Sequence, residues 1–223
     1  MGFSGFPRFY EIWLASEAGQ RWFAGLRLPN EDGAFLCSNC TMSHRPRGLT
    51  RDLGPFHPDI KCCTFHPYLP SFTVGALFVE ADEGRLESQS LWTYLEQSRL
   101  DSLGAHSVKN TTSICETGKR FEDRCVFYQK GRCGIHGFRP STCAAYVCRS
   151  NAGREGLQAW RRWESRFAEF EWSLAHEVAF DLGFTLDDVR ERFKNLVDAE
   201  RFYRKSYEIA RTIDIGQRFG LNA

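Results

Sequence analysis

Nine cysteines constrain what this chain can fold into, because all of them lie between residues 37 and 148. They are Cys37, Cys40, Cys62, Cys63, Cys115, Cys125, Cys133, Cys143 and Cys148. The chain has 223 residues and 42% hydrophobic content, enough to form a core without cross-links. The cysteine count is odd, and closely spaced thiols in such a chain indicate metal binding or thiol chemistry rather than a disulfide framework.

The charge balance and the N-terminal sequence predict a cytoplasmic protein. Lys+Arg 29 against Asp+Glu 28 leaves a formal net charge of +1, without the basic excess expected of a nucleic-acid-binding protein. The N-terminal sequence lacks a basic region followed by an apolar run, so no secretory signal is predicted. No window approaches the ~20 apolar residues of a membrane span. We therefore expect a reducing compartment, with neither a nucleic acid nor a membrane as partner.

Hydrophobic spacing predicts one helix at the start of the chain and one in its middle. Residues 7–28 fit an amphipathic helix that ends at Pro29 and Asn30. Its expected buried positions are Phe9, Ile12, Trp13, Trp22, Phe23 and Leu26. Residues 31–149 are expected to form a cysteine-cluster, metal-binding core of loops and short strands. That core contains one helix over residues 86–100, with Leu91, Trp92 and Leu95 facing inward.

Residues 150–223 are predicted to form a C-terminal helical extension of two antiparallel helices. Apolar residues recur every three or four positions from residue 157 to residue 182, and Gly183 suits the position after a helix end. This stripe consists of Trp160, Trp163, Phe167, Phe170, Leu174, Val178 and Leu182. Thr185 is the expected N-cap of the second helix, with Asp188 as its capping partner. The apolar positions expected along it are Val189, Phe193, Leu196, Tyr203, Tyr207, Ala210 and Ile213.

The predicted fold is a single α+β domain over residues 1–223, small and irregular. Its loop-rich cysteine core carries a short β-hairpin and is flanked by the N-terminal helix and the C-terminal helical hairpin. A region with few regular backbone ladders needs another source of stability. Metal binding can supply it, because forming the site and folding the chain are linked.

The strongest local signal is the run from Cys125 to Cys143. Cys125 to Tyr128 fits a strand and Arg132 to His136 its return, joined by a three-residue loop with Gly131 in the left-handed position. In that register Phe127 faces Cys133, so Cys125 and Cys133 point to the same side of the hairpin. A two- or four-residue loop would separate them.

A short helix is expected to follow the hairpin. Arg139 precedes Pro140, and proline favours the first helical position, so residues 140–148 are predicted to be helical with Cys143 in the first turn. A helix N-terminus stabilises a thiolate, which is the form that binds metal. Cys148 lies five residues further on, either as a ligand or as a small buried side chain.

The upstream cysteines form a second group. Cys37 and Cys40 have the C-x2-C spacing of zinc knuckles. Adjacent side chains diverge, so one member of the Cys62–Cys63 pair is expected to face the same ion as the other ligands. Cys115 fits a buried apolar role.

Several histidines lie within or beside these motifs. His44, His57, His66 and His136 could complete a mixed site, as histidine does in Rieske-type centres, although each alone also suits a loop or surface position. The loop over residues 41–61 contains three arginines. It is either a rim over an anionic thiolate cluster or a solvated insertion.

These residues resemble the YkgJ-type cysteine-cluster proteins, described as zinc- or iron-chelating domains. That family has an upstream cysteine group ending in Cys-Cys, then a run of the type C-x-(apolar)…G-x-C-x-I-(Tyr/His)-x-x-R-P-x-x-C. The matching residues are Cys125-Val126-Phe127, Gly131-Arg132-Cys133-Gly134-Ile135-His136, Arg139-Pro140 and Cys143, with Cys62-Cys63 as the proximal pair. The resemblance spans roughly residues 37–148 and departs upstream, where 21 residues separate Cys40 from Cys62. It implies metal binding.

Three hypotheses for function follow. The first is an iron–sulfur protein, with a 4Fe–4S cluster as a candidate type, in a redox or accessory role. The second is a structural zinc module that binds a partner through its helices. The third is a protein-modifying enzyme, because flagellin lysine N-methylase is similar to the same cysteine-cluster group. The expected ligands are Cys37, Cys40, Cys62, Cys63, Cys125, Cys133, Cys143 and Cys148. A protein substrate or redox partner is expected, and no residue is assigned a catalytic role.

Overall fold

A computed structural model describes residues 7–26, 63, 65–108, 124–129, 132–145 and 153–221. Within them the protein is a mixture of helices and small antiparallel sheets, as the α+β prediction requires. The helical elements are η1 (Arg8–Tyr10), α1 (Glu11–Leu14), α2 (Glu17–Trp22), α3 (Ser71–Asp82), α4 (Ser88–Glu96), η5 (His136–Phe138), α5 (Ser141–Ala144), α6 (Gly153–Asp181), α7 (Leu196–Ala210) and α8 (Ile215–Arg218). The strands are β1 (Leu69–Pro70), β2 (Ser98–Asp101), β3 (Gly104–Ser107), β4 (Tyr128–Gln129) and β5 (Arg132–Cys133).

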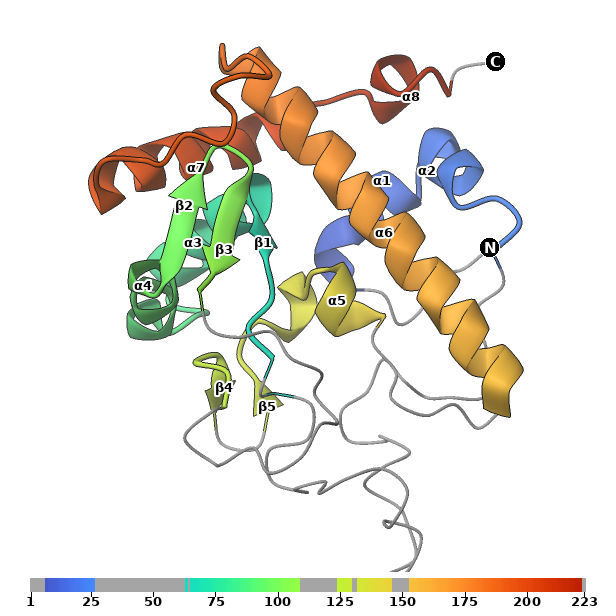
Figure 1. The fold of residues 1–223 in the computed structure, drawn as a ribbon, viewed down its shortest axis with the longest axis horizontal. Helices are drawn as coiled ribbons and strands as arrows, with labels where there is room; N and C mark the ends of the chain where they lie inside the picture. The colour runs from blue at the N-terminus through green and yellow to red at the C-terminus, as the bar shows by residue number, and fades with distance from the viewer. Residues whose placement is uncertain are drawn as a thin grey trace, which may run out of the picture.

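The long helix α6 crosses the molecule (Figure 1). The short N-terminal helices lie along it, whereas α3, α4, α7 and the three-stranded sheet lie at its other side. The hairpin β4–β5 lies below that sheet in the view, and α5 lies between the hairpin and α6. Strand β3 is central in the larger sheet and pairs antiparallel with both β1 and β2.

Two clusters of buried side chains form the core. The first core cluster gathers around α6 and consists of Phe9, Tyr10, Trp13, Leu14, Ala18, Phe23, Phe72, Ala76, Leu103, Ala144, Ala145, Trp160, Trp163, Phe167, Phe170, Leu174, Ala175, Val178, Ala179, Val189, Ala210 and Ile215. The second core cluster gathers around α3 and α4 and consists of Leu69, Val74, Leu77, Phe78, Leu91, Tyr94, Leu95, Leu100, Ala105, Cys125, Phe127, Ile135, Ala199 and Tyr203.

The N-terminal segment is helical but broken, so the prediction of one continuous helix over residues 7–28 is wrong. The break is at Ser16, whose hydroxyl oxygen accepts a hydrogen bond from the Gly19 amide at 3.0 Å and starts a new helix, α2. Phe9, Trp13 and Phe23 are buried as predicted, and Trp22 and Leu26 are partly buried. Ile12, which was predicted to be buried, is 54% exposed.

Helix α6 confirms the apolar stripe. Six of its predicted positions are buried and the seventh, Leu182, is partly buried. Gly183 ends the helix with φ 89°, and the Phe184 amide donates to the Ala179 carbonyl at 3.1 Å. This is the left-handed helix end that the glycine predicts.

The second C-terminal helix starts later than predicted. Asp188 does accept a hydrogen bond from the Thr185 amide, but residues 186–190 form turns rather than a helix. Helix α7 begins at Leu196, where the side chain of Asn195 accepts a hydrogen bond from the Asp198 amide at 2.9 Å. Because α7 packs chiefly against α3, the expected pairing of two C-terminal helices is a minor part of its contacts.

Helix α3 was missed by the sequence patterns. Its first eight residues are all buried, so it has no polar face and shows no amphipathic period. The backbones of α3 and α7 approach so closely that a Cβ on Gly75 would lie 1.9 Å from the Tyr203 carbonyl oxygen.

The helix predicted over residues 86–100 is shorter in the structure. It is α4, which ends at Glu96, and the chain then enters β2. Leu91 and Leu95 are buried as predicted, and Trp92 is partly buried. Among the described residues of the central zone, α3, α4 and the three-stranded sheet thus accompany the cysteine-bearing hairpin and α5.

No helix among the described residues has both the length and the apolar character that crossing a membrane requires.

Candidate metal centre

Four of the predicted cysteine ligands lie in the part of the chain that the structure describes: Cys63, Cys125, Cys133 and Cys143. The other four predicted ligands, Cys37, Cys40, Cys62 and Cys148, lie outside it, as do Cys115, His44, His57 and the loop over residues 41–61. The four described cysteines form no disulfide with one another.

Cys63 and Cys125 are brought together by a backbone hydrogen bond. The amide of Cys125 donates to the carbonyl oxygen of Cys63 at 2.5 Å, although 61 residues lie between them in the sequence. Cys125 is 8% exposed and belongs to the second core cluster. The downstream member of the Cys-Cys pair therefore lies beside the first cysteine of the distal run, as a shared site requires.

The hairpin that carries Cys133 has a different register from the predicted one. Tyr128 pairs with Cys133, and Gln129 pairs with Arg132, so two residues join the strands instead of three. The prediction that Phe127 faces Cys133 is therefore wrong. The reason lies at Cys125, whose carbonyl accepts a hydrogen bond from the Tyr128 amide at 2.9 Å. Residues that were predicted to form the strand belong to this turn instead. The alternation of side chains along a strand therefore does not determine where the Cys125 side chain points.

Cys143 occupies the first turn of α5, as predicted. Pro140 precedes the helix, and the Cys143 amide donates to the Pro140 carbonyl at 2.9 Å. The helix ends at Ala144 rather than at residue 148. Ala144 and Ala145 are buried in the first core cluster, which fixes this short helix against α6.

Tyr94 shows that two of the cysteines share an environment. Burial raises the pKa of the Tyr94 hydroxyl well above its usual value, and negative charge on Cys125 and Cys143 raises this pKa further. Cys63 and Cys133 are partly buried and pack against the same second core cluster. Cys63, Cys125 and Cys133 thus belong to or pack against the core cluster that contains Tyr94, and Cys143 acts electrostatically on the Tyr94 hydroxyl.

This gathering is not an assembled metal site. No three His, Cys, Asp or Glu side chains of the described ranges are grouped so that they could hold one metal ion. His66, one of the histidines that sequence analysis considered, is 3% exposed, and His136 is half-buried. What the described residues supply is a set of sulfur donors at one end of a core.

Glu171 is a buried carboxylate that sequence analysis missed. Its oxygens accept hydrogen bonds from the Ser141 amide, at 3.0 and 3.1 Å, and from the Tyr10 hydroxyl at 2.5 Å. Burial raises the pKa of the Glu171 carboxyl to about 7, while the hydrogen bonds from Ser141 and Tyr10 act to lower it. The carboxylate thereby ties α6 to η1 and to the first residue of α5, two residues before Cys143.

A signal for Glu171 was present in the sequence. It lies four residues after Phe167 and three before Leu174, so it falls on the apolar stripe of α6. A charged residue on the buried face of an amphipathic helix needs a hydrogen-bond partner.

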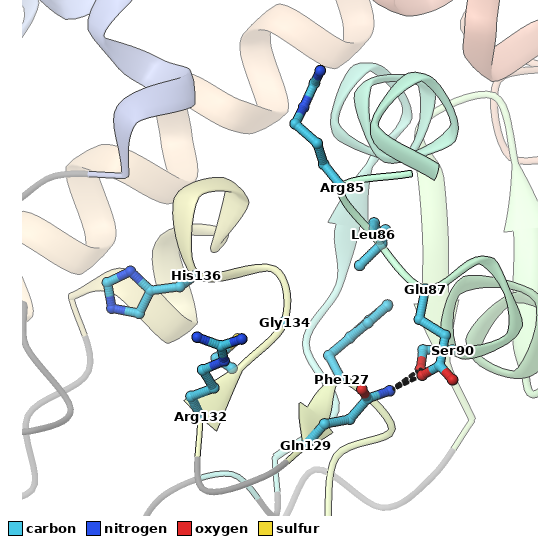
Figure 2. A pocket seen from close by; sticks show the side chains of 10 residues that line it. Arg85, Leu86, Glu87, Ser90, Phe127, Gln129, Arg132, Gly134 and His136 are labelled. Carbon is cyan, nitrogen blue, oxygen red and sulfur yellow. Dashed lines mark hydrogen bonds between the residues drawn. The ribbon is translucent and has the colours of Figure 1, made fainter. Parts of the chain in front are cut away.

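Two pockets flank the hairpin, and each reaches one of the cysteines. The larger, about 400 Å³, is lined by Arg85, Leu86, Glu87, Ser90, Phe127, Gln129, Arg132, Cys133, Gly134 and His136 (Figure 2). The smaller, about 320 Å³, is lined by Gln89, Ser90, Thr93, Arg124, Cys125, Val126, Tyr128 and Gln129. Gln129 donates a hydrogen bond to the Ser90 hydroxyl at 2.6 Å, and these two residues belong to both pockets.

No protein-family model, curated protein or solved structure matches this chain. The resemblance of its motifs to the YkgJ-type cysteine-cluster proteins therefore stays a prediction from the sequence.

Proposed function

We propose that this protein holds an iron–sulfur cluster on its central cysteines and uses it in a redox or accessory role. The observation that carries the proposal is the hydrogen bond between the Cys125 amide and the Cys63 carbonyl. It brings the backbone of Cys63, one of the two candidates for the fourth ligand, beside that of Cys125, the first cysteine of the distal run. The position of Cys133 and Cys143 near the same part of the core supports it further.

The chemistry of the donors suits such a cluster, although no three donors of the described ranges are grouped around one point. Iron–sulfur clusters are bound by cysteine thiolates, commonly four of them. Cys125, Cys133 and Cys143 would supply three, and Cys62 or Cys63 the fourth. Cys37, Cys40 and Cys148 would complete this site or form a second one, and Cys115 is not among the proposed ligands. When bound, a cluster of this kind supplies one-electron redox chemistry, with a reduction potential that depends on its hydrogen bonds and burial.

The residues around the cysteines fit a buried cluster as well. Cys125 is almost fully buried, and the other three described cysteines are partly buried, so the thiols are partly shielded from water. Low exposure and nearby hydrogen-bond donors are features that tune the potential of such clusters.

A structural zinc module is the second candidate. One structural zinc ion requires four ligands, and the described cysteines alone number four. In that case the metal would fasten the β4–β5 hairpin and α5 to the segment at residue 63. The helices would then be free to bind a partner protein.

Metal and sulfide analysis separates the two candidates. The chain is purified anaerobically, and iron, acid-labile sulfide and zinc are measured per chain together with the visible absorption spectrum. Matched iron and sulfide with a brown colour support the iron–sulfur proposal. One zinc ion in a colourless protein supports the structural module. A chain that contains neither metal, even after anaerobic reconstitution with iron and sulfide or with zinc, contradicts both.

A further inference from the structure

The larger pocket lies between the start of α4 and the β4–β5 hairpin. Its volume of about 400 Å³ falls within the ~300–1,000 Å³ of small-molecule sites. Its walls combine apolar and polar side chains, with Cys133 among them. Such a pocket can receive a ligand that has a small apolar body and one polar group.

The apolar wall is fixed by the core. Phe127 is 1% exposed, and its ring centroid lies 5.2 Å from that of Tyr94. Leu86 packs against the same second core cluster and lines the pocket with Phe127. Because both side chains are already held by the core, binding an apolar ligand group here costs little side-chain entropy.

The polar wall is also held in place. Gln129 donates hydrogen bonds to the Ser90 hydroxyl and to the Glu87 carboxylate, and Ser90 donates to the same carboxylate at 3.1 Å. Figure 2 shows this connection between Gln129 and the start of α4. Glu87, the one acidic residue of the pocket lining, therefore already accepts hydrogen bonds from Ser90 and Gln129.

Arg132 supplies the available positive charge. It is exposed, and it forms no ion pair with any residue of the described ranges. It pairs with Gln129 across the hairpin, so the two side chains leave the same face. The other arginine of the lining, Arg85, is bound to Glu80 at 2.6 and 2.7 Å. In Figure 2 the guanidinium of Arg85 points away from the other side chains, whereas Arg132 lies between His136 and Phe127.

We propose that this pocket binds a carboxylate carried on a small apolar body. The guanidinium of Arg132 pairs with the carboxylate, for which its planar donors are suited. Leu86 contacts the apolar body, and the buried ring of Phe127 supports that wall from behind. This inference deepens the proposed function and rests on it in one respect: with Cys133 as a metal ligand, the bound acid lies beside the cluster. The carboxylate can come from a free small acid or from an acidic side chain of a peptide.

The test uses benzoate and its neutral analogue benzamide as probes. Each is titrated into the anaerobically purified protein, and backbone amide shifts are followed by NMR. We expect benzoate to shift the amides of Phe127, Gln129 and Gly134 and to bind at least about tenfold more tightly than benzamide, because a charge-assisted pair is lost with the amide.

Variants identify the cation. Arg132→Gln is expected to weaken benzoate binding at least about tenfold, and Arg132→Lys to recover part of the loss because it keeps the charge. Arg201→Gln is the control, since Arg201 is exposed on α7 and does not line the pocket. Measurable binding of benzoate and benzamide with equal affinity, or unchanged binding of the acid in Arg132→Gln, overturns the inference.

A second pair of probes distinguishes the sources of the carboxylate. Capped Ala-Glu-Ala and Ala-Gln-Ala peptides are compared in the same way. Binding of the glutamate peptide alone assigns the pocket to acidic side chains, and binding of benzoate alone assigns it to small acids; both outcomes support the inference. If the protein binds benzoate but contains no metal, the proposed function is overturned and the pocket inference is not. Protein that holds metal but binds neither acid overturns the pocket inference alone.

Discussion

The two carboxylate oxygens of Glu171 accept hydrogen bonds from the backbone amide of Ser141, at 3.0 and 3.1 Å, and Ser141 lies two residues before Cys143. Through this contact the long helix α6 fixes the start of the short helix that carries a predicted ligand. A four-residue helix has little stability of its own. Its position therefore depends on contacts with α6, of which Glu171 supplies the polar part, and Ala144 and Ala145 the apolar part.

Glu171→Gln should make stability less dependent on pH. The pKa of the Glu171 carboxyl is raised to about 7 in the folded state from 4.5, so the stability it contributes is complete below pH 4.5 and is lost as the pH rises through 7. A shift of this size corresponds to about 3 kcal/mol. Tyr10 and Tyr68, the other titratable groups near this carboxyl, stay neutral over this range because burial raises their pKa values.

Urea unfolding at pH 5 and pH 8 measures this effect. The free energy of unfolding of the wild type should fall by about 2 kcal/mol more than that of Glu171→Gln between the two pH values, because part of the contribution is already lost at pH 5. Glu169→Gln, an exposed change on the same helix, serves as the control and should behave as the wild type. Identical pH dependence in the wild type and Glu171→Gln would show that the buried carboxyl does not titrate in this range.

Serine at Cys125, Cys133 or Cys143 should remove metal and lower stability. A metal present at 1,000 times its dissociation constant stabilises the folded chain by ~4 kcal/mol, and this contribution is lost with the ligand. The measurements are metal per chain and the melting temperature, with and without a chelator. Full metal content and unchanged melting in all three variants would exclude these cysteines as ligands.

The double variant Cys37→Ser, Cys40→Ser should reveal whether the upstream pair belongs to the site. The 21-residue separation from Cys62 leaves two arrangements, a shared site or a second one. Loss of all metal indicates a shared site, and loss of half indicates a second. A double variant that keeps every metal ion would show that neither residue is a ligand, and the ligand set would then come from the remaining cysteines.

Gly75→Ala should destabilise the fold strongly. The new Cβ would lie 1.9 Å from the Tyr203 carbonyl oxygen, so α3 and α7 would have to separate. Overpacking at such a contact costs about 3 kcal/mol. Gly137→Ala is the matched control, because a Cβ there meets nothing within 4 Å. Chemical denaturation of both variants gives the comparison, and equal midpoints would contradict the close approach of the two helices.

The sequence predicted those elements whose pattern is local. Helix α6 has a polar face and an apolar stripe, so its extent and its end at Gly183 follow from spacing and from one turn residue. Helix α3 lacks that contrast because its first eight residues are all buried, and a buried stretch without a polar face has no period to detect. The start of α7 could not be predicted from local sequence, because Thr185 and Asn195 both have side chains that can cap a helix.

The membership of the candidate site stays a prediction, and part of its predicted geometry is wrong. The matching of Cys125, Cys133 and Cys143 to one motif came from their spacing, and the contact between Cys63 and Cys125 agrees with it. The predicted register of the hairpin was wrong, because a turn at Cys125 shortens the first strand. Glu171 escaped notice because its partners, Tyr10 and Ser141, are far away in the sequence.

Native mass spectrometry of the anaerobically purified chain tests the central claim most directly, since it weighs the folded protein with whatever its cysteines hold. The proposal predicts a mass above the 25.7 kDa of the chain by matched numbers of iron and sulfide. It also predicts that this added mass disappears in Cys125→Ser. An added mass of zinc alone would support the structural module instead. The mass of the bare chain, obtained also after anaerobic reconstitution with iron and sulfide, would contradict the account.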